Sequence, residues 1–541
     1  MYSAGFFYGT VDFDPGPGVL NRTSAGLNDM FVMKLDPNGN LLWVKTGGSG
    51  GTDVVNSLVV SPNGNIYMTG FFYGLVDFDF GAGIDTIRNA DHPCNTEIFI
   101  LKMDTAGNHI WAKSVEGVVT ICTDATDVGY SVQLDQNENV YLTGYFRGSA
   151  DFNPGHSVGD TFRLSVNGPI YTEDVYILKL TTSGDFVYAY NVGCVLSDIG
   201  YGIHVSQSGE VYVAGLYGCP VDFDPTAGFD TINSIGNWDG FLMKLDTAGN
   251  YSWAVGIGGS GDDRFMGVTT DAAGYVYATG HYTGVVDFDP SVAVHNLVAP
   301  SGQRGSFILK LDNQGNYIWA KGMTGIGGGE RAGAYLATDN QMNVYLTGYF
   351  TETVDFNPSL LAADTFNLTA PGPWNNTNSY FMKVDSSGQF QWAYTTGTTG
   401  VDRGKCIQVD GAYNIYFCGY YTGTIDADPG AGADTLFGHG IDDIIVMKLS
   451  QPVSGTDEFS ISEDQIQIIP NPADEMITVT SAHFVHYGNV RIFDLQGRMV
   501  QSENWTQSNR MEMNVSQLAP GIYTMKIETD AGSVSKKIIV H

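Results

Sequence analysis

The chain has 541 residues, which is too long for one ordinary hydrophobic core and predicts either several domains or an array of repeats. Its 58 acidic residues outnumber its 25 basic ones, and the resulting net charge of −33 excludes nucleic acids and anionic membranes as electrostatic partners. With 69 glycines, 12% aromatic residues and only 15% charged residues, the composition is typical of short strands joined by tight turns, so we expect an all-β protein.

The chain begins inside a phrase that it later repeats. "MYSAGFFYGTVDFDPG" at residues 1–16 returns as "IYMTGFFYGLVDFDFG" at residues 66–81, so that Met1 aligns with Ile66, the start of a predicted strand. The opening residues have neither the basic nor the apolar segment of a signal peptide, and no apolar run reaches the roughly 18 residues of a membrane span. We therefore expect no transmembrane segment and a truncated N-terminus, with the signal peptide missing from this chain.

The repeated phrase occurs seven times, and its spacing predicts an array. The distance between successive copies ranges from 65 residues (Asp12 to Asp77) to 74 residues (Asp77 to Asp151). The second copy predicts four strands, at residues 57–61, 66–72, 97–104 and 109–114, with Asn- and Gly-rich hairpin turns at 62–65 and 104–108. The aspartates that mark the seven copies are Asp12, Asp77, Asp151, Asp222, Asp287, Asp355 and Asp426.

Seven four-stranded antiparallel units predict a seven-bladed β-propeller over residues 1–450, with a β-solenoid as the alternative. The chain starts at the second strand of the first unit and leaves after the third strand of the last, so one blade should lack its inner strand and another its outer strand. A large aromatic residue recurs in the fourth strand, where we expect it to wedge neighbouring blades apart rather than to bind a ligand. These residues are Trp43, Trp111, Tyr188, Trp253, Trp319 and Trp392.

Residues 1–450 resemble a family of bacterial repeats. The resemblance rests on "VYLTGYFRGSADFNPG" at 140–155 and "DVYILKL" at 174–180, with their counterparts in the other copies. They resemble SBBP-type β-propeller repeats, and this resemblance implies a propeller fold in an extracellular setting but no particular reaction. "KLDPNGNLLWVKTGG" at 34–48 also resembles, in part, the repeats of PQQ-dependent dehydrogenases, although Asn-Gly-Asn stands where those repeats carry Thr-Gly-Lys.

A second domain follows a polar linker at residues 451–464. Residues 465–541 alternate in short apolar runs that predict a small Ig-like β-sandwich. Four stretches, "IIPNPADEMITV", "VRIFDLQGRMV", "LAPGIYTMKI" and "KKIIVH", resemble in order the C-terminal sorting domain (Por) of the type IX secretion system. The resemblance implies that residues 465–541 are handled by that machinery and that the protein is secreted or held at the outer-membrane surface.

The six cysteines predict disulfides, which suit an oxidising destination. Cys406 and Cys418 flank the turn at 410–414 and should lie opposite each other in a hairpin. Cys94 and Cys122 bracket another hairpin, and Cys194 and Cys219 fall in two loops expected on one face. Three bridges are predicted from these pairs; buried free thiols are the alternative reading.

A second acidic series lies between successive units. Its members precede the second strand of a unit at a common spacing, except that Glu330 is one residue out of register; they are Asp53, Asp127, Asp198, Asp263, Glu330 and Asp402. Arg264 and Arg403 adjoin this series, as does Arg331 one place off. Such a ring of charges predicts either a ligand site at the channel mouth, with arginines gripping a carboxylate as in sialidases, or Asp–Arg pairs that tie neighbouring blades together.

The repeated Asp phrase itself allows a cation loop, with Ca²⁺ as the one cofactor considered. The last copy is the best candidate because Asp426, Asp428 and Asp434 lie within "DADPGAGAD". The alternative is a turn that merely defines the repeat. No nucleophile elbow, P-loop or HExxH motif occurs, and the ten histidines show no metal-ligand spacing.

Three functions remain open from the sequence. We favour a monomeric binding or adhesion scaffold for an extracellular glycan or protein, because the long loops "RNADHPCNTE" and "SLLAADTFNLTAPGPWNNTNS" differ from unit to unit. The alternatives are a carbohydrate-active hydrolase or lyase that uses carboxylates at the channel mouth, and a structural component of a surface layer. An enzyme should gather its perturbed carboxylates in one pocket, whereas a scaffold should spread its polar groups around the ring.

Overall fold

The structure is a computed structural model that falls into two compact units, residues 1–450 and 451–541. It describes the whole chain except residues 90–94, 118–125, 155–160, 227, 301, 327–334, 359–364, 371–375, 398–399, 429–433, 439, 441, 452–465, 495–497 and 530–531. Every regular element among the described residues is a β-strand, which confirms the all-β prediction.

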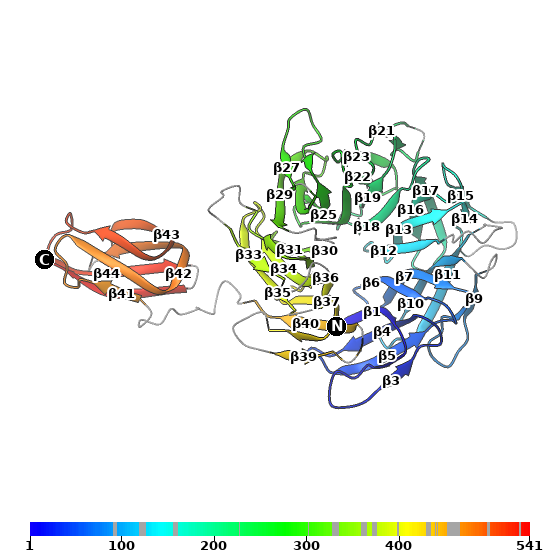
Figure 1. The fold of residues 1–541 in the computed structure, drawn as a ribbon, viewed down its shortest axis with the longest axis horizontal. Helices are drawn as coiled ribbons and strands as arrows, with labels where there is room; N and C mark the ends of the chain where they lie inside the picture. Colours follow the sequence, from blue (N-terminus) through cyan, green and yellow to red (C-terminus); the bar gives the residue numbers. More distant parts are fainter. Residues whose placement is uncertain are drawn as a thin grey trace. The chain divides into compact units, whose positions relative to one another are not determined.

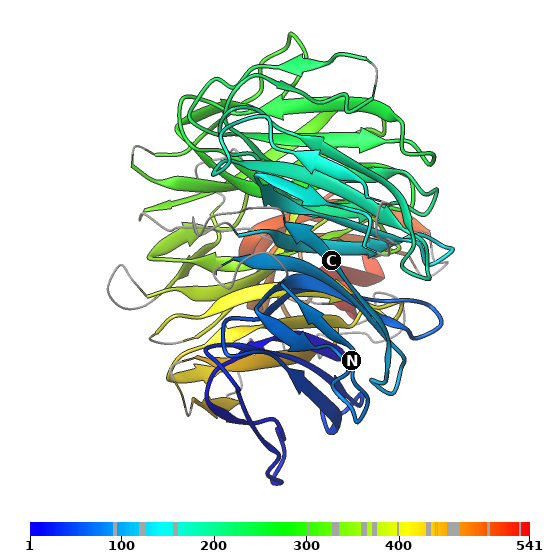
Figure 2. The ribbon, with the colours of Figure 1, turned by 90° about the vertical axis from the view of Figure 1, so that its right-hand side faces the viewer.

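The first unit is a ring of antiparallel sheets that follow one another in chain order (Figure 1). Each complete unit contributes four strands, of which the first lies nearest the ring axis. In two units the hairpin of the next unit pairs with the outer strand and extends the sheet to six strands. Consecutive inner strands contact each other around the ring, as β6 does with β12 and β18 with β24. Figure 2 turns this ring by 90° and shows the sheets side by side, with loops at both ends of their strands. The inner strands are β6 (Val54–Val60), β12 (Val128–Leu134), β18 (Ile199–Val205), β24 (Arg264–Thr270), β30 (Tyr335–Thr338) and β36 (Arg403–Val409).

The second and third strands occur in all seven units, as the repeat count requires. The second strands are β1 (Tyr2–Phe7), β7 (Ile66–Tyr73), β13 (Val140–Arg147), β19 (Val211–Tyr217), β25 (Val276–Thr283), β31 (Val344–Phe350) and β37 (Ile415–Tyr421). The third strands are β4 (Asp29–Leu35), β10 (Thr96–Met103), β16 (Glu173–Leu180), β22 (Asp239–Leu245), β28 (Arg304–Leu311), β34 (Asn378–Val384) and β40 (Asp443–Leu449).

The outer strands are β5 (Leu41–Gly47), β11 (His109–Gly117), β17 (Phe186–Val192), β23 (Tyr251–Ile257), β29 (Tyr317–Ile326) and β35 (Phe390–Thr396). The first sheet therefore has the order β1-β4-β5 without an inner strand, and the last has the order β36-β37-β40 without an outer strand. In each incomplete sheet, the missing strand is the one whose absence the sequence predicts. The number of blades in a complete ring stays a prediction.

Each repeated Asp phrase forms a small two-stranded hairpin between the second and third strands of its sheet. The hairpins pair β2 (Thr10–Asp12) with β3 (Asn21–Thr23), β8 (Leu75–Asp77) with β9 (Thr86–Arg88), β14 (Ser149–Asp151) with β15 (Arg163–Ser165), β20 (Val221–Asp222) with β21 (Thr231–Ile232), β26 (Val285–Asp287) with β27 (Asn296–Val298), β32 (Thr353–Asp355) with β33 (Asn367–Thr369), and β38 (Thr424–Asp426) with β39 (Thr435–Phe437).

The hydrophobic core of the ring is a series of clusters between neighbouring sheets. One cluster joins Tyr67 of the second sheet to Leu142 and Leu178 of the third, all buried. The first sheet has its own cluster around Phe7 and Phe31, and Val446 of β40 packs against it. The last and first sheets are therefore neighbours in the ring, although they are far apart in the sequence.

The second unit is a small β-domain of five strands: β41 (Ile466–Ile469), β42 (Met476–Phe493), β43 (Met499–Asn514), β44 (Gly521–Thr529) and β45 (Gly532–Val540). Two pairs of predicted short runs are continuous strands, because β42 and β43 pair along nearly their full length. All five strands join into one sheet rather than two separate ones, since β42 pairs with β41 near its start and with β44 near its end. The strands enclose one core, in which Trp505 is 1% exposed.

Candidate functional site

The first acidic series closes the hairpins. In the last copy, Oδ1 of Asp426 accepts hydrogen bonds from the backbone N–H groups of Asp428 at 3.1 Å and Asp434 at 2.9 Å. The marker aspartates of the other six copies make the same two contacts across their own loops. Backbone N–H donors already surround this oxygen, so the contacts assign Asp426 to the hairpin turn. Among the described residues, no group of three or more His, Cys, Asp or Glu side chains is arranged to hold a metal ion.

The second acidic series is buried between sheets. Asp198 is 1% exposed, and its two carboxylate oxygens accept N–H groups of Cys194 at 2.6 Å and Gly218 at 3.0 Å. Its own N–H donates to the carbonyl of Glu173 in the preceding sheet at 2.8 Å. Asp53 and Asp263 repeat both carboxylate contacts, and Asp127 and Asp402 retain the one to the end of the second strand. The structure therefore places these carboxylates one per sheet, where they fasten loops to strands; Glu330 lies outside the described residues.

Burial perturbs the acidity of this series. Loss of solvation outweighs the N–H donors and raises the pKa of Asp198 to about 8. The same cause raises the pKa of Asp127 and Asp402 to about 7 and that of Asp263 to about 6. These four carboxylates belong to four different sheets. Burial also raises the pKa values of Asp174 and Asp239, which lie close to Asp198 and Asp263.

The arginines beside this series lie over aromatic rings. The guanidinium carbon of Arg403 is 4.5 Å from the ring centre of Tyr349 and 5.9 Å from that of Tyr420. The guanidinium of Arg264 lies 6.0 Å from the ring centre of Trp238. These cation–π contacts join neighbouring loops and strands. Arg331, the third arginine of the predicted cluster, lies outside the described residues.

The cysteines follow the predicted pairing in part. Cys194 and Cys219 form the predicted disulfide. Cys406 and Cys418 lie directly opposite each other on β36 and β37, as predicted, but both are free thiols, so the bridge predicted between them is absent. Directly opposed Cβ atoms in a sheet are about 4.5–5.5 Å apart, whereas a disulfide needs about 3.5–4.5 Å. Cys94 and Cys122 lie outside the described residues.

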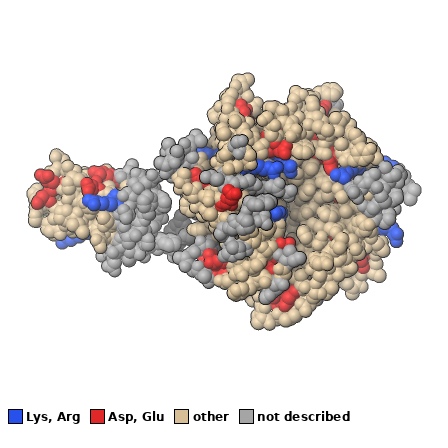
Figure 3. Space-filling view, viewed as in Figure 1, with Lys and Arg blue, Asp and Glu red and all other residues tan. Residues whose placement is uncertain are grey.

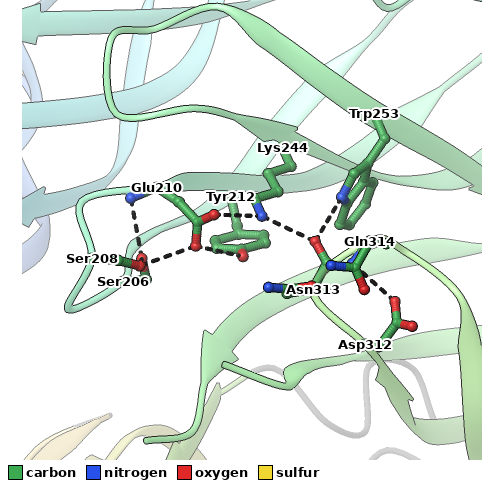
Figure 4. A network of polar contacts seen from close by, with 9 residues as sticks. All are labelled: Ser206, Ser208, Glu210, Tyr212, Lys244, Trp253, Asp312, Asn313 and Gln314. Atoms are coloured by element: carbon green, nitrogen blue, oxygen red, sulfur yellow. Dashed lines mark hydrogen bonds and ion pairs between the residues drawn. The ribbon is translucent and has the colours of Figure 1, made fainter. Parts of the chain in front are cut away.

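A repeated contact between sheets went unnoticed in the sequence. In the fourth sheet, Nζ of Lys244 lies 2.7 Å from Oε1 of Glu210 and donates at 3.0 Å to the carbonyl of Asn313 in the fifth sheet (Figure 4). The indole N–H of Trp253 donates to the same carbonyl at 3.1 Å. The lysine also lies over the ring of Tyr212, at 5.4 Å from its centre. We call this arrangement the lysine latch.

The lysine latch recurs around the ring. Lys34, Lys102 and Lys310 donate to the equivalent turn carbonyls of Thr105, Thr182 and Ser386 in the next sheet. A lysine lies over a tyrosine ring in all seven sheets. The signal was present in the sequence, because each third strand carries Lys at one position and each second strand carries Tyr. The hydrogen bond from Trp253 to the next sheet also shows that this aromatic position takes part in the packing between sheets.

An apolar groove lies on the described surface of the ring. A groove of about 420 Å³ lies between the first three sheets, and its lining includes Phe6, Phe71, Val128 and Tyr145. Its polar groups are partly engaged, since Thr126 shares a hydrogen bond with the hydroxyl of Tyr145 at 3.0 Å. Figure 3 shows one face of the ring, on which acidic and basic side chains lie in small, separate groups.

The hairpins expose apolar residues at a repeated position. Val19, Ile84, Phe229 and Val294 are 73%, 83%, 89% and 65% exposed. Each is the fifth residue after the second acid of its phrase, namely Asp14, Asp79, Asp224 and Asp289. We call these four side chains the hairpin tips. Single exposed apolar residues are ordinary on a protein surface, but a fixed position in four loops is not explained by chance exposure.

Two known proteins are similar to parts of this chain. It is 26% identical over 470 residues to the uncharacterized WD repeat-containing protein L264 of Acanthamoeba polyphaga mimivirus, which covers 76% of this chain and 32% of that protein. It is 28% identical over 135 residues to the regulatory protein FlaEY of Caulobacter vibrioides, covering 24% and 14%. The chain thus spans about a third or less of these relatives.

Solved structures give only distant likenesses. The extracellular domain of a protein described as a hybrid two component system from B. thetaiotaomicron has 11% identity and a TM-score of 0.18, covering 95% of this chain and 80% of that one. Dimeric latent PorU from Porphyromonas gingivalis has 8% identity and a TM-score of 0.13, covering 90% and 32%. These scores carry no argument about the fold.

The C-terminal unit matches a known domain family. Residues 467–541 match the family model of the secretion system C-terminal sorting domain. Asn471 of the "IIPNPADE" stretch shows why this pattern matters locally: its amide donates to Lys537 O and accepts from Ile539 N–H, both at 2.9 Å, and so holds the last strand. No helix in the described part of the chain has the length and hydropathy to cross a membrane. The protein carries a type IX sorting domain at its C-terminus and is exported to the cell surface or secreted.

Proposed function

We propose that the protein is an extracellular binding scaffold that contacts a glycan or another matrix polymer through the hairpin tips. The observation that carries this proposal is the repeated exposure of Val19, Ile84, Phe229 and Val294. Apolar surface exposed to water gains free energy when a partner covers it. Several weak contacts on one rigid ring add up when a polymer engages them together.

The buried carboxylates favour a scaffold over an enzyme. Groups with raised pKa values, such as Asp127 and Asp198, mark active sites when they converge on one cleft. Here they lie in different sheets and hold backbone N–H groups of their own loops. A glycosidase needs two carboxylates at a separation of about 5–10 Å across one substrate bond. Asp198 and Asp263 each have an acidic neighbour, Asp174 and Asp239, but these second carboxylates also accept backbone N–H groups.

Binding to immobilised polysaccharides tests the proposal. The variant Val19→Ser, Ile84→Ser, Phe229→Ser, Val294→Ser removes all four hairpin tips and should weaken binding at least about tenfold, since each lost apolar contact contributes about 1 kcal/mol. The matched control is Leu42→Ser, Ile110→Ser, Val187→Ser, Ile318→Ser, which removes apolar residues of the outer strands that are 55%, 45%, 44% and 39% exposed.

The control separates specific contact from general stickiness. We expect it to bind like the unaltered protein, because its four residues lie on the outer strands rather than on the hairpins. Equal loss of binding in both variants would show non-specific hydrophobic adhesion and would reject the hairpin tips as the site. Unchanged binding in the tip variant would also reject them. Measurement in Ca²⁺ and in EDTA tests the cation loop at Asp426 in the same experiment.

A further inference from the structure

The ring has two open strand edges that lie in neighbouring sheets. β1 pairs with β4 on one side and has no inner partner in the described sheet, and β40 pairs with β37 and has no outer partner. An unpaired edge presents a row of backbone donors and acceptors to which another strand can add. Val446 of β40 packs against the core of the first sheet, so both edges belong to one junction of the ring.

Gly5 of β1 indicates which kind of strand fits the first open edge. In five sheets, a Cβ on the equivalent glycine would lie only 1.8–2.1 Å from a carbonyl oxygen of the inner strand, so only glycine fits there. These glycines are Gly70, Gly144, Gly215, Gly280 and Gly419. Gly5 occupies the same position in β1, yet the nearest atom to its Cβ would be a ring carbon of Phe31 at 3.1 Å. Gly5 therefore suits an inner strand that the described residues do not supply.

A second glycine gives the same indication at the other open edge. In five sheets, the glycine of the turn between the third and fourth strands packs under the large aromatic residue of the preceding outer strand. Gly107, for example, would place a Cβ 2.9 Å from the ring of Trp43, and Gly249 would place one 2.6 Å from the ring of Tyr188. Gly39 in the first sheet would meet nothing within 4 Å. The aromatic residue that fits over Gly39 would come from an outer strand next to β40.

Side-chain exposure agrees with both positions. Phe6 of β1 is 51% exposed, whereas its counterparts in the sheets with an inner strand are half-buried, as Phe71 and Tyr145 are, or buried, as Leu216 is at 2%. Ile444 of β40 is 36% exposed, whereas its counterpart Met30 is fully buried in a sheet that has an outer strand. Apolar side chains are therefore left uncovered at both edges where a strand would cover them.

One segment fits both edges at once. Along the chain, the outer strand of each sheet leads directly into the inner strand of the next, as β5 leads into β6 within residues 41–60. We infer that the edges of β40 and β1 form a single acceptor site for an extended segment with the pattern of residues 41–60, supplied from outside the described residues. Its first half adds an outer strand to the last sheet and places an aromatic residue over Gly39. Its second half adds an inner strand to the first sheet, with a carbonyl against Gly5.

A fusion tests this inference. A copy of residues 41–65 is joined directly before Met1, so that Met1 takes the place of Ile66 after the natural turn at 61–65. Amide hydrogen exchange of the full chain is then compared with that of a fusion carrying the same 25 residues in scrambled order. We expect exchange in β1 and β40 to slow at least about tenfold in the native-order fusion only, because paired amides open far less often than edge amides.

Substitution of Gly5 provides the internal control. In the unfused chain, Gly5→Ala should leave exchange and Tm nearly unchanged, because the nearest atom is the edge of a single ring. In the fusion, Gly5→Ala should abolish the new protection of β1 by clashing with the added carbonyl, while β40 keeps its own. The inference is overturned if β1 and β40 exchange equally fast in both fusions, or if Gly5→Ala leaves the protection of β1 intact.

Discussion

At the residue scale, the chain uses its repeated charged residues to hold the ring together. The lysine latch gives each of four described lysines a turn carbonyl of the next sheet as partner. The buried aspartates bond loop N–H groups at the same junctions. Their regular spacing in the sequence indicated importance but not its kind, because spacing alone does not distinguish a ligand site from a structural bond. The direction of the N–H donors in the structure makes that distinction.

Substituting one latch lysine tests this role. Lys244→Met keeps most of the apolar stem but removes the ion pair with Glu210 and the bond to Asn313. We expect a loss of about 1–2 kcal/mol of stability, at the lower end because Trp253 still donates to the same carbonyl. Lys45→Met on the outer strand β5 is the control, with an expected change below about 0.5 kcal/mol. Calorimetry of both full-length variants measures the effect, and equal Tm values for the two would contradict the latch.

At the element scale, the sequence predicted most strands and the nature of both incomplete sheets. Hairpin turns such as that at 104–108 were recognisable because Asp and Asn side chains bond to the turn backbone and Gly adopts the positive φ that the turn needs. The sequence predicted correctly that Cys406 and Cys418 lie opposite each other in a hairpin. It could not predict that the two thiols stay free, because disulfide formation depends on the separation of the side chains. The sequence predicted too many short strands in residues 465–541, because the polar residues within β42 and β43 resemble turns between strands. The hairpin tips were not predicted because their shared position in four loops is visible in the sequence, whereas their exposure to solvent is not.

At the scale of the whole molecule, the raised pKa values predict how stability depends on pH. An aspartate whose pKa is higher in the folded state binds more protons there than in the unfolded chain. Its stabilising contribution is complete below the unfolded pKa of about 4 and is lost as the pH rises through the folded value, which is about 8 for Asp198 and about 7 for Asp127 and Asp402. Asp36 acts in the opposite sense, since the Asn40 side chain lowers its pKa, but only below about pH 4.

We therefore expect the Tm of the ring to fall as the pH is raised from about 4 to about 8. Asp198→Asn should make this decline shallower by up to about one proton in the linkage relation, because the amide does not titrate. Scanning calorimetry across this pH range, at constant ionic strength, measures the slope. A slope that is the same in Asp198→Asn and in the unaltered protein would show that Asp198 does not titrate there.

Whether this ring binds its ligand without transforming it is tested by an assay for release of reducing ends from every polysaccharide that the full chain retains. We expect binding with no release above that of the buffer. Release that is abolished by Asp198→Asn or Asp263→Asn in a correctly folded protein would contradict it and would identify the buried carboxylates as catalytic.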